Sequence, residues 1–260
     1  MTILDQLSEH ARARVAEAKR ARPFSAVRDA ALAMPKGDFP FESALSGPEL
    51  AFICECKKAS PSKGLIAPKF PYLDIAKDYA AAGAAAISVL TEPKWFLGSD
   101  DYLRRIAASV PVPCLRKDFT VDEYMLYEAK TLGASAALLI VAILDECQIR
   151  DFIQVCDVLG LSALVEAHDE NEAEAALRAG ARIVGVNNRN LKDFSVDTNN
   201  SRRLRAMIPE SVLFVSESGV KDARDVQAAR DMGADAVLVG ETLMRARDKK
   251  AKLTELRGAI

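Results

Sequence analysis

Six charged or amide side chains stand at the ends of apolar segments or directly after them. They are Glu55, Lys57, Lys117, Glu166, Asn187 and Glu217. An ammonium group can donate a proton and a carboxylate can accept one, so a cavity that gathers both types can catalyse proton transfer. Burial and a second lysine disfavour the ammonium form, whereas nearby glutamates restore it. We therefore expect a lysine that donates its proton near neutral pH.

The alternation of side chains along a β-strand predicts which of these groups face one another. Residues two apart point to the same side of a strand, so an inward-facing Ile53 places Glu55 and Lys57 inward and turns Cys54 and Cys56 outward. The same alternation along the other strands turns the remaining four polar residues toward the same interior; they are Lys117, Glu166, Asn187 and Glu217. Structural salt bridges explain any one such residue equally well, but six polar groups in an apolar interior favour a functional site.

Two glycine turns and one polar loop predict an anion site. The turns are S-E-S-G (216–219) and G-E-T-L (240–243), and backbone N–H groups of such turns bind phosphate. The loop A-S-P-S-K-G (59–64) has the hydroxyls, lysine and flexibility of a loop that closes over a substrate, although Lys63 alone fits an exposed turn equally well. No Ser-His-Asp or Cys-His pattern competes with this interpretation, and we expect His168 to be a surface or packing residue.

A repeating unit supplies the elements that must position these residues. A glycine followed by alanine recurs at Gly83, Gly133, Gly180 and Gly233, at intervals of roughly 50 residues. Each glycine ends a segment with helical periodicity and precedes a short apolar run, as expected for a left-handed residue between a helix and a strand. Four further apolar runs raise the predicted number of strands to eight; they are 51–56, 112–115, 161–165 and 212–215. Helices are expected, among others, over 122–132, 145–159, 171–179 and 223–232.

Strands and helices therefore alternate, which predicts an α/β fold with a parallel sheet covered by helices. An open doubly wound sheet would satisfy this order, but four similar quarters favour a closed, eight-stranded parallel (β/α)8 barrel. Active sites of such barrels lie at the carboxyl ends of the strands, where the polar residues stand.

The first 50 residues fall outside the repeat. Residues 4–21 are expected to be helical, and 23–50, with four prolines, to be a connector. We expect 1–50 to be an N-terminal helical extension packed on a catalytic barrel of 51–260, in a single structural domain. The extension is either a solvated appendage or a lid over the barrel mouth.

Composition argues against several other classes of protein. The chain has 260 residues, of which 50% are hydrophobic and 28% charged, and a formal net charge of −2, as in a soluble globular protein. We expect no membrane span or secretory signal, a cytoplasmic location and a monomer. Five cysteines in apolar segments predict reduced core thiols, and two scattered histidines argue against a metal site. The lack of a basic run interleaved with aromatic residues argues against nucleic-acid binding.

Seven motifs, taken in order, resemble the indole-3-glycerol phosphate synthase family of tryptophan biosynthesis. They are I-C-E-C-K-K-A-S-P-S-K-G, T-E-P-K-W-F-L-G-S, L-R-K-D-F, L-V-E-A-H, G-V-N-N-R-N-L, S-E-S-G and L-V-G-E-T-L-M, and they lie within residues 45–248. The resemblance implies closure of 1-(2-carboxyphenylamino)-1-deoxyribulose 5-phosphate to indole-3-glycerol phosphate, with loss of carbon dioxide and water. It implies a small anionic phosphosugar-anthranilate substrate and no cofactor.

The resemblance also implies a role for each polar residue at the strand ends. Lys117 would be the general acid that protonates the substrate carbonyl, and Glu166 the base that removes a proton. Lys57 would pair with the anthranilate carboxylate and act in dehydration, so the division of acid steps between the two lysines stays open. Glu55 would orient both lysines. The residues implied to bind the sugar hydroxyls and the developing charge are Asn187 and Glu217.

Matching positions imply contacts to the two ends of the substrate. Those at the phosphate are Ser60, Arg189, Ser218, Gly219 and Gly240. Those around the aromatic ring are Trp95, Phe96, Phe119 and Leu138. Glu241 departs from the pattern, because some members of the family have serine there. A carboxylate is no donor, so Glu241 can offer the phosphate only its backbone N–H.

Three other functions fit parts of the pattern. A Schiff-base aldolase for a phosphosugar would use Lys117 or Lys57 as its nucleophile. Phosphoribosylanthranilate isomerase is close in fold and pathway, but the long K-K-A-S-P-S-K-G block and the ring of glutamates exceed what an isomerisation needs. A phosphosugar-binding barrel that has lost catalysis would use the anion site alone.

Overall fold

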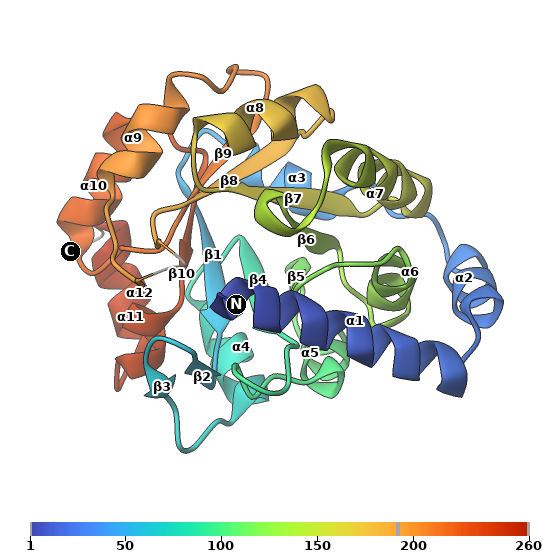
Figure 1. Cartoon of the computed structure of the whole chain (residues 1–260). Helices are drawn as coiled ribbons and strands as arrows, with labels where there is room; N and C mark the ends of the chain where they lie inside the picture. Colours follow the sequence, from blue (N-terminus) through green and yellow to red (C-terminus); the bar gives the residue numbers. More distant parts are fainter. Residues whose placement is uncertain (1, 191–192, 259–260) are drawn as a thin grey trace.

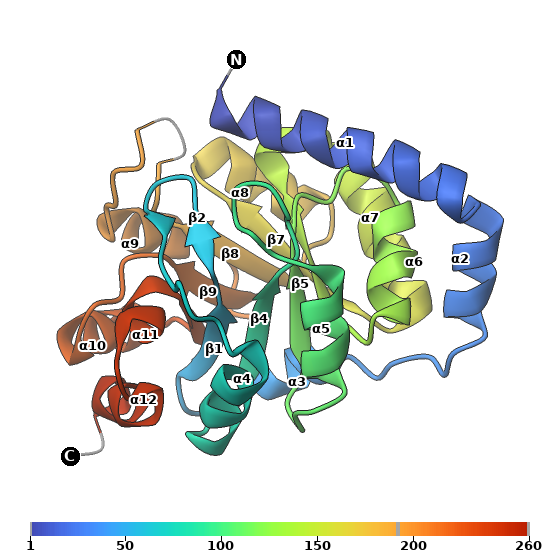
Figure 2. The same ribbon diagram turned by 90° about the horizontal axis from the view of Figure 1, so that it is seen from below.

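Eight parallel strands close into a barrel in the computed structural model, which describes residues 2–190 and 193–258 (Figures 1 and 2). In order around the barrel they are β1 (Ala51–Cys56), β10 (Ala236–Val239), β9 (Leu213–Glu217), β8 (Ile183–Asn187), β7 (Ser162–Ala167), β6 (Ala136–Ile140), β5 (Cys114–Lys117) and β4 (Ala86–Leu90). A short antiparallel hairpin of β2 (Ala59–Ser60) and β3 (Gly64–Leu65) follows β1. The predicted (β/α)8 barrel is confirmed.

Helices follow the strands and form the outer layer. They are α4 (Tyr72–Ala81), α5 (Asp100–Ala107), α6 (Tyr124–Thr131), α7 (Glu146–Leu159), α8 (Glu170–Arg178), α9 (Asn199–Arg205), α10 (Ala223–Asp231), α11 (Glu241–Arg245) and α12 (Lys249–Arg257), with a 3-10 turn η1 (Val141–Ile143) after β6. The four repeat glycines follow helices with φ between 76° and 91°, the left-handed conformation predicted for them.

The boundaries of the elements differ from the predicted ones by one or two residues. The run predicted over 112–115 forms the strand Cys114–Lys117 instead. Pro111 and Pro113 precede this strand, and proline has no N–H to donate to a sheet, so pairing begins only after them.

Side chains of the strands alternate between two apolar layers. Ile53, Leu115, Leu164 and Val215 belong to the cluster inside the barrel, whereas Cys54 belongs to the cluster between strands and helices. The predicted phase is therefore confirmed, and it directs the polar residues two positions further along the strands to the barrel mouth. One cysteine departs from the expected core thiols. Cys147 is exposed on α7, because it lies on the face of this amphipathic helix opposite the core side chains.

The N-terminal segment contains three helices and covers both ends of the barrel (Figure 2). α1 (Ile3–Ala21) crosses the mouth, and α2 (Phe24–Leu32) packs beside α6. α3 (Pro40–Leu45) lies at the opposite end, where Phe41 and Leu45 join the interior cluster. The prediction of a connector over 23–50 was wrong. Pro23 and Pro40 occupy the N-cap of α2 and the first turn of α3, where a missing N–H costs nothing.

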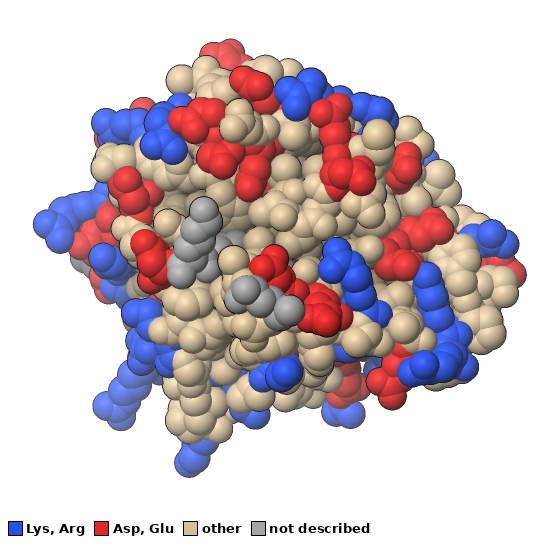
Figure 3. All heavy atoms as spheres, in the orientation of Figure 1, with Lys and Arg blue, Asp and Glu red and all other residues tan. Residues whose placement is uncertain are grey.

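The surface carries charges of both signs. Figure 3 shows acidic and basic side chains interspersed over the face that carries α1, without a continuous basic area on this face. Among the described residues, no helix has both the length and the apolar character needed to cross a membrane.

Candidate active site

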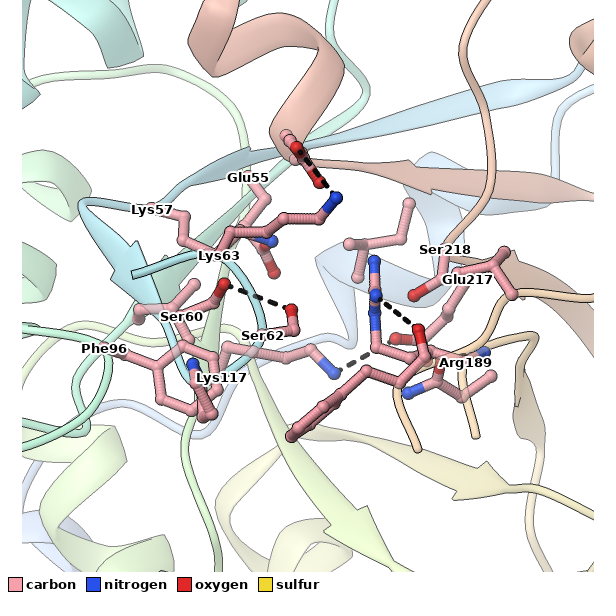
Figure 4. A pocket seen from close by; sticks show the side chains of 18 of the residues that line it. Glu55, Lys57, Ser60, Ser62, Lys63, Phe96, Lys117, Arg189, Glu217 and Ser218 are labelled. Atoms are coloured by element: carbon pink, nitrogen blue, oxygen red, sulfur yellow. Dashed lines mark hydrogen bonds and ion pairs between the residues drawn. The ribbon is translucent and has the colours of Figure 1, made fainter. Parts of the chain in front are cut away.

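A cavity of about 620 Å³ opens at the carboxyl ends of the strands, beneath α1. Every residue that the sequence predictions assign to the site lines this cavity, with the exception of Trp95: Glu55, Lys57, Ser60, Phe96, Lys117, Phe119, Leu138, Glu166, Asn187, Arg189, Glu217, Ser218, Gly219, Gly240 and Glu241. Figure 4 shows that these side chains come from opposite walls, with Lys117 extending across the cavity toward Glu217.

Lys117, the last residue of β5, holds two carboxylates from two other strands of the barrel. Its Nζ lies 2.7 Å from Oε2 of Glu166 on β7 and 3.0 Å from Oε2 of Glu217 on β9. Burial disfavours the ammonium form, but Glu166, Glu217 and Glu55 outweigh burial and raise the pKa of Lys117. The glutamates therefore outweigh desolvation, and Lys117 is a charged ammonium at neutral pH.

The two glutamates beside Lys117 have different surroundings. Burial disfavours the charge on Glu166, but Lys117, His168 and the amide of Asn187 outweigh it and lower the pKa to about 2. Burial and the neighbouring Glu166 raise the pKa of Glu217 to about 7, even though Lys117 opposes them. Glu166 has three stabilising partners, whereas Oε1 of Glu217 is buried without a hydrogen-bond partner. At neutral pH, Glu166 is therefore ionised and able to accept a proton.

Gly185 on β8 makes room for the Glu217 carboxylate. A Cβ atom at this position would overlap Oε1 of Glu217 and come within 3.2 Å of Cδ1 of Leu164. This contact is consistent with the inward phase predicted for Asn187, which lies two residues further along the same strand. A strand residue without a side chain lets a carboxylate from the neighbouring strand lie inside the barrel.

Lys57 and Glu55 form a second ion pair, on β1 and just beyond its end. Lys57 Nζ lies 2.5 Å from Oε1 of Glu55, and Ser88 donates a hydrogen bond of 3.4 Å to the other carboxylate oxygen. Gly240 leaves space for this pair, because a Cβ there would overlap Oε1 of Glu55 and approach Lys57 Nζ to 2.8 Å. The pair therefore lies against the turn that follows β10.

The predicted anion end of the cavity is built from left-handed backbone. Ser218 and Gly219, directly after β9, have φ of 65° and 102°. Asn188 holds this turn by donating to the carbonyl of Ser218 at 3.0 Å. Thr242 joins it to the turn after β10 by donating to the carbonyl of Val220 at 2.5 Å. Successive residues of this kind turn backbone N–H groups toward one concave surface, which suits an anion.

Two further side chains flank this anion end. Arg189 bonds to the carbonyl of Phe194 at 3.1 Å, and the part of its motif at 191–192 lies outside the described residues. Glu241 turns its carboxylate to Arg245 at 2.9 Å and lies 3.7 Å from Lys63 Nζ. Its charge is therefore neutralised by neighbouring cations.

The apolar part of the cavity contains two aromatic rings that face one another. The centroids of Phe96 and Phe119 lie 6.1 Å apart with the planes tilted by 42°, and Leu138 lines the same space. Trp95 was expected here as well, but it does not line the cavity. Its ring packs edge-on against His10 of α1, with the centroids 5.3 Å apart, because successive residues of this irregular loop point in different directions.

Sequence reasoning missed some neighbours of the site. Ile3, Leu4 and Leu7 of α1 line the cavity, so α1 is a cover and not a solvated appendage. Their helical spacing was a signal that this face packs on something. His168 was expected to be a surface or packing residue, but it lies between two carboxylates: its side chain is 16% exposed, its Nε2 lies 3.4 Å from Oε1 of Glu166, and its Nδ1 lies 3.0 Å from Oε2 of Glu172. Within the part of the chain that the structure describes, no group of three or more His, Cys, Asp and Glu residues could hold a metal ion.

Comparison with known proteins shows one family over nearly the whole chain. The model of the family "Indole-3-glycerol phosphate synthase" matches residues 4–256. A protein of that name from Ruminiclostridium cellulolyticum is 56% identical over 258 residues, which cover 99% of each chain. A second, from Leuconostoc mesenteroides, is 53% identical over 223 residues, or 85% of each chain. Among solved structures, 3-hexulose-6-phosphate synthase shares the fold with a TM-score of 0.64 at 18% identity, covering 81% of this chain and 100% of its own.

Proposed function

The chain belongs to the indole-3-glycerol phosphate synthase family, and we propose from its own geometry how it performs this reaction, with Lys117 as the general acid. The enzyme is a carboxy-lyase of tryptophan biosynthesis. It closes the ring of 1-(2-carboxyphenylamino)-1-deoxyribulose 5-phosphate and releases carbon dioxide and water.

The cavity matches the charge distribution of this substrate. The phosphate fits the turns at Ser218 and Gly219 and at Gly240, with Ser60 and Arg189 beside them. The aromatic ring fits between Phe96 and Phe119, against Leu138. Lys57 is the cation for the anthranilate carboxylate, which would replace Glu55 as its partner.

Ring closure begins with proton donation. The Lys117 ammonium gives a proton to the substrate carbonyl oxygen, so that the aryl carbon attacks the carbonyl carbon and a C–C bond forms. Glu217 and Asn187 line the cavity near Lys117, and they stabilise the hydroxyl that forms from the carbonyl oxygen. A substrate that displaces the glutamates from Lys117 lowers the pKa of its ammonium, which strengthens the acid at the moment of use.

Decarboxylation and dehydration complete the indole. The carboxylate leaves as carbon dioxide, and the electron pair of the broken bond restores the aromatic ring. The hydroxyl then leaves as water, with a proton from Lys57 or Lys117. Glu166, an ionised carboxylate held in place by Asn187, removes the proton that creates the double bond of the new ring.

One observation carries the proposal: Lys117 is a buried ammonium held by two carboxylates from two other strands, 2.7 Å and 3.0 Å away. The test is to supply the substrate and record indole fluorescence with the wild-type chain and with Lys117→Met. We expect turnover by the wild type and a loss of at least about 10³-fold in kcat for the variant. Turnover by Lys117→Met at the wild-type rate would exclude Lys117 as the acid.

The same geometry disfavours the Schiff-base aldolase. An ammonium held by two carboxylates is not nucleophilic, since a Schiff base requires the free amine. Borohydride treatment in the presence of substrate should therefore leave no stable adduct on Lys117 or Lys57, and mass spectrometry of the intact chain would detect one.

Location, oligomeric state and domain organisation complete the proposal. A biosynthetic enzyme of this family suits the cytoplasm, and the cavity is complete within one chain, from α1 to the turns after β9 and β10. We therefore propose a cytoplasmic monomer in which extension and barrel form one structural domain. Light scattering coupled to gel filtration should give a mass near 28.2 kDa.

A further inference from the structure

Two buried carboxylates beside the mouth, Glu92 and Asp118, take no part in the proposed chemistry. Both side chains are fully shielded from solvent. Glu92 follows β4, and Asp118 follows Lys117 at the end of β5. A buried charge is costly unless it is paired and hydrogen-bonded, so the partners of these two groups indicate what they hold in place.

Glu92 organises the loop that carries Phe96. Its carboxylate accepts hydrogen bonds from the backbone N–H groups of Lys94, Trp95 and Phe96 at 3.0, 2.7 and 3.0 Å. The backbone carbonyl of Glu92 accepts a fourth bond, from the N–H of Gly98 at 2.8 Å. The loop is therefore wound around one carboxylate, and the position of Phe96 depends on where that carboxylate lies.

Asp118 fixes the backbone at Phe119 in a similar way. The rings of Phe96 and Phe119 form the two sides of the apolar part of the cavity, which we call the slot. It accepts the backbone N–H of Phe119 at 2.8 Å and the hydroxyl of Thr91 at 2.6 Å. Thr91 precedes Glu92 in the chain, so the two carboxylates belong to one connected network. The network has Phe96 at one end and Phe119 at the other.

α1 places a cation against Asp118 and an imidazole ring beside Glu92. Arg14 binds Asp118 with two hydrogen bonds, of 2.6 and 3.1 Å, in the bidentate arrangement that fixes orientation as well as distance. Burial raises the pKa of Asp118, but Arg14, with Arg116 and Thr91, outweighs burial and lowers it. His10 places Nδ1 3.2 Å from Glu92 and packs edge-on against Trp95.

We propose that Arg14 and His10 are positioning residues for the aromatic ring of the substrate, and that they act through Asp118 and Glu92 on the slot between Phe96 and Phe119. Docking of α1 and occupation of the slot by a ring then favour one another, because each needs the same position of the two carboxylates. This inference rests on the proposed function, which assigns the slot to the ring.

The test compares ligands that have a ring with a ligand that has none. Arg14→Met keeps the apolar length of the side chain and removes both hydrogen bonds to Asp118. We expect KM for the substrate and the inhibition constant of indole-3-glycerol phosphate to rise roughly tenfold, since a charged hydrogen-bonding pair is lost. The inhibition constant of inorganic phosphate should change less than about twofold, because the anion turns are untouched. His10→Gln should show the same pattern with a smaller change.

Lys19→Met is the matched control on the same helix. Lys19 pairs with Asp122 at 2.7 Å, and the Asp122 carboxylate also accepts the N–H of Tyr124. This pair makes no contact with Glu92 or Asp118. We expect this variant to bind all three ligands as the wild type does. Melting curves of all variants verify that each is folded before its constants are compared.

Trp95 supplies a readout that needs no ligand. It is the only tryptophan of the sequence, so its emission reports the loop wound around Glu92. Arg14→Met and His10→Gln should shift this emission and increase its quenching by acrylamide, and Lys19→Met should do neither.

Three outcomes would overturn the inference: equal weakening of phosphate and ring-bearing ligands by Arg14→Met, no change for either, or the same effect from Lys19→Met. A failure of the proposed function looks different. In that case the wild type itself would form no indole and would bind indole-3-glycerol phosphate no more tightly than inorganic phosphate.

Discussion

The two lysines of the barrel mouth have opposite kinds of partner. Lys117 is held by Glu166 and Glu217, which lie 49 and 100 residues away in the sequence, on β7 and β9. Lys57, directly after β1, is held by Glu55, two residues earlier in the chain. Their exposures are similar, at 13% and 18% of the side chain. The difference thus lies in the origin of the carboxylates and not in burial.

This difference separates two tasks. Partners on other strands fix Lys117 relative to the whole barrel, as an acid must be fixed relative to the carbonyl that it protonates. A partner two residues away in the chain moves together with Lys57 and leaves the cavity side of Lys57 open to a new anion. We therefore expect changes around Lys117 to lower kcat and changes around Lys57 to raise KM.

Apart from replacing Lys117 itself, the largest effect that would sharpen this comparison is expected from Glu166→Gln. The amide keeps the shape and the contact to Lys117 but cannot accept the substrate proton, so kcat should fall by roughly 10²- to 10³-fold with KM nearly unchanged. Steady-state kinetics of indole formation check this. A variant with normal kcat would show that another group is the base.

Two glycine substitutions should have intermediate effects on the kinetics, one in the surroundings of Lys117 and one in those of Lys57. Gly185→Ala would push the Glu217 carboxylate away from its place beside Lys117, and Gly240→Ala would push apart Glu55 and Lys57. The expected result is a drop of roughly tenfold in kcat for the first and a rise of roughly tenfold in KM for the second. Similar kinetic defects in both variants would contradict the division of tasks.

The smallest effect concerns stability and pH. The pKa of Glu217 is raised by burial and by Glu166 to about 7, above its value of 4.5 in an unfolded chain. A raised pKa stabilises the fold below pH 4.5, and this contribution is lost as the pH rises toward 7. Glu217→Gln has no such loss. Relative to the variant, the wild type should therefore lose on the order of 2 kcal/mol in its free energy of unfolding between pH 5 and pH 8. Urea titrations at the two pH values measure the difference, and a constant difference would contradict it.

How far the sequence predicts this site depends on the range of the interaction. Strand periodicity alone placed Lys117, Glu166 and Glu217 in one interior, because alternation is a local property of the backbone. Periodicity does not say which carboxylates meet which ammonium, and the high pKa of Lys117 follows only from barrel closure. The prediction that Trp95 lies at the aromatic ring was wrong, because the side chains of an irregular loop do not alternate regularly as those of a strand do.

The N-terminal segment shows a second limit. Prolines indicated a connector over 23–50, but Pro23 and Pro40 begin helices instead of interrupting them. The apolar positions of α1 are recognisable as an amphipathic face. The surface that this face covers, and with it the contacts of Arg14 and His10, exists only once the barrel has formed.

The central claim is tested most directly by measuring binding and chemistry separately in Lys117→Met and Lys57→Met. Equilibrium binding of substrate gives Kd, and a single turnover with excess enzyme gives the rate of indole formation. We predict a Kd near the wild-type value and a single-turnover rate reduced at least about 10³-fold for Lys117→Met, with a much larger effect on Kd for Lys57→Met. A Lys117→Met variant that forms indole at the wild-type rate once substrate is bound would contradict the account.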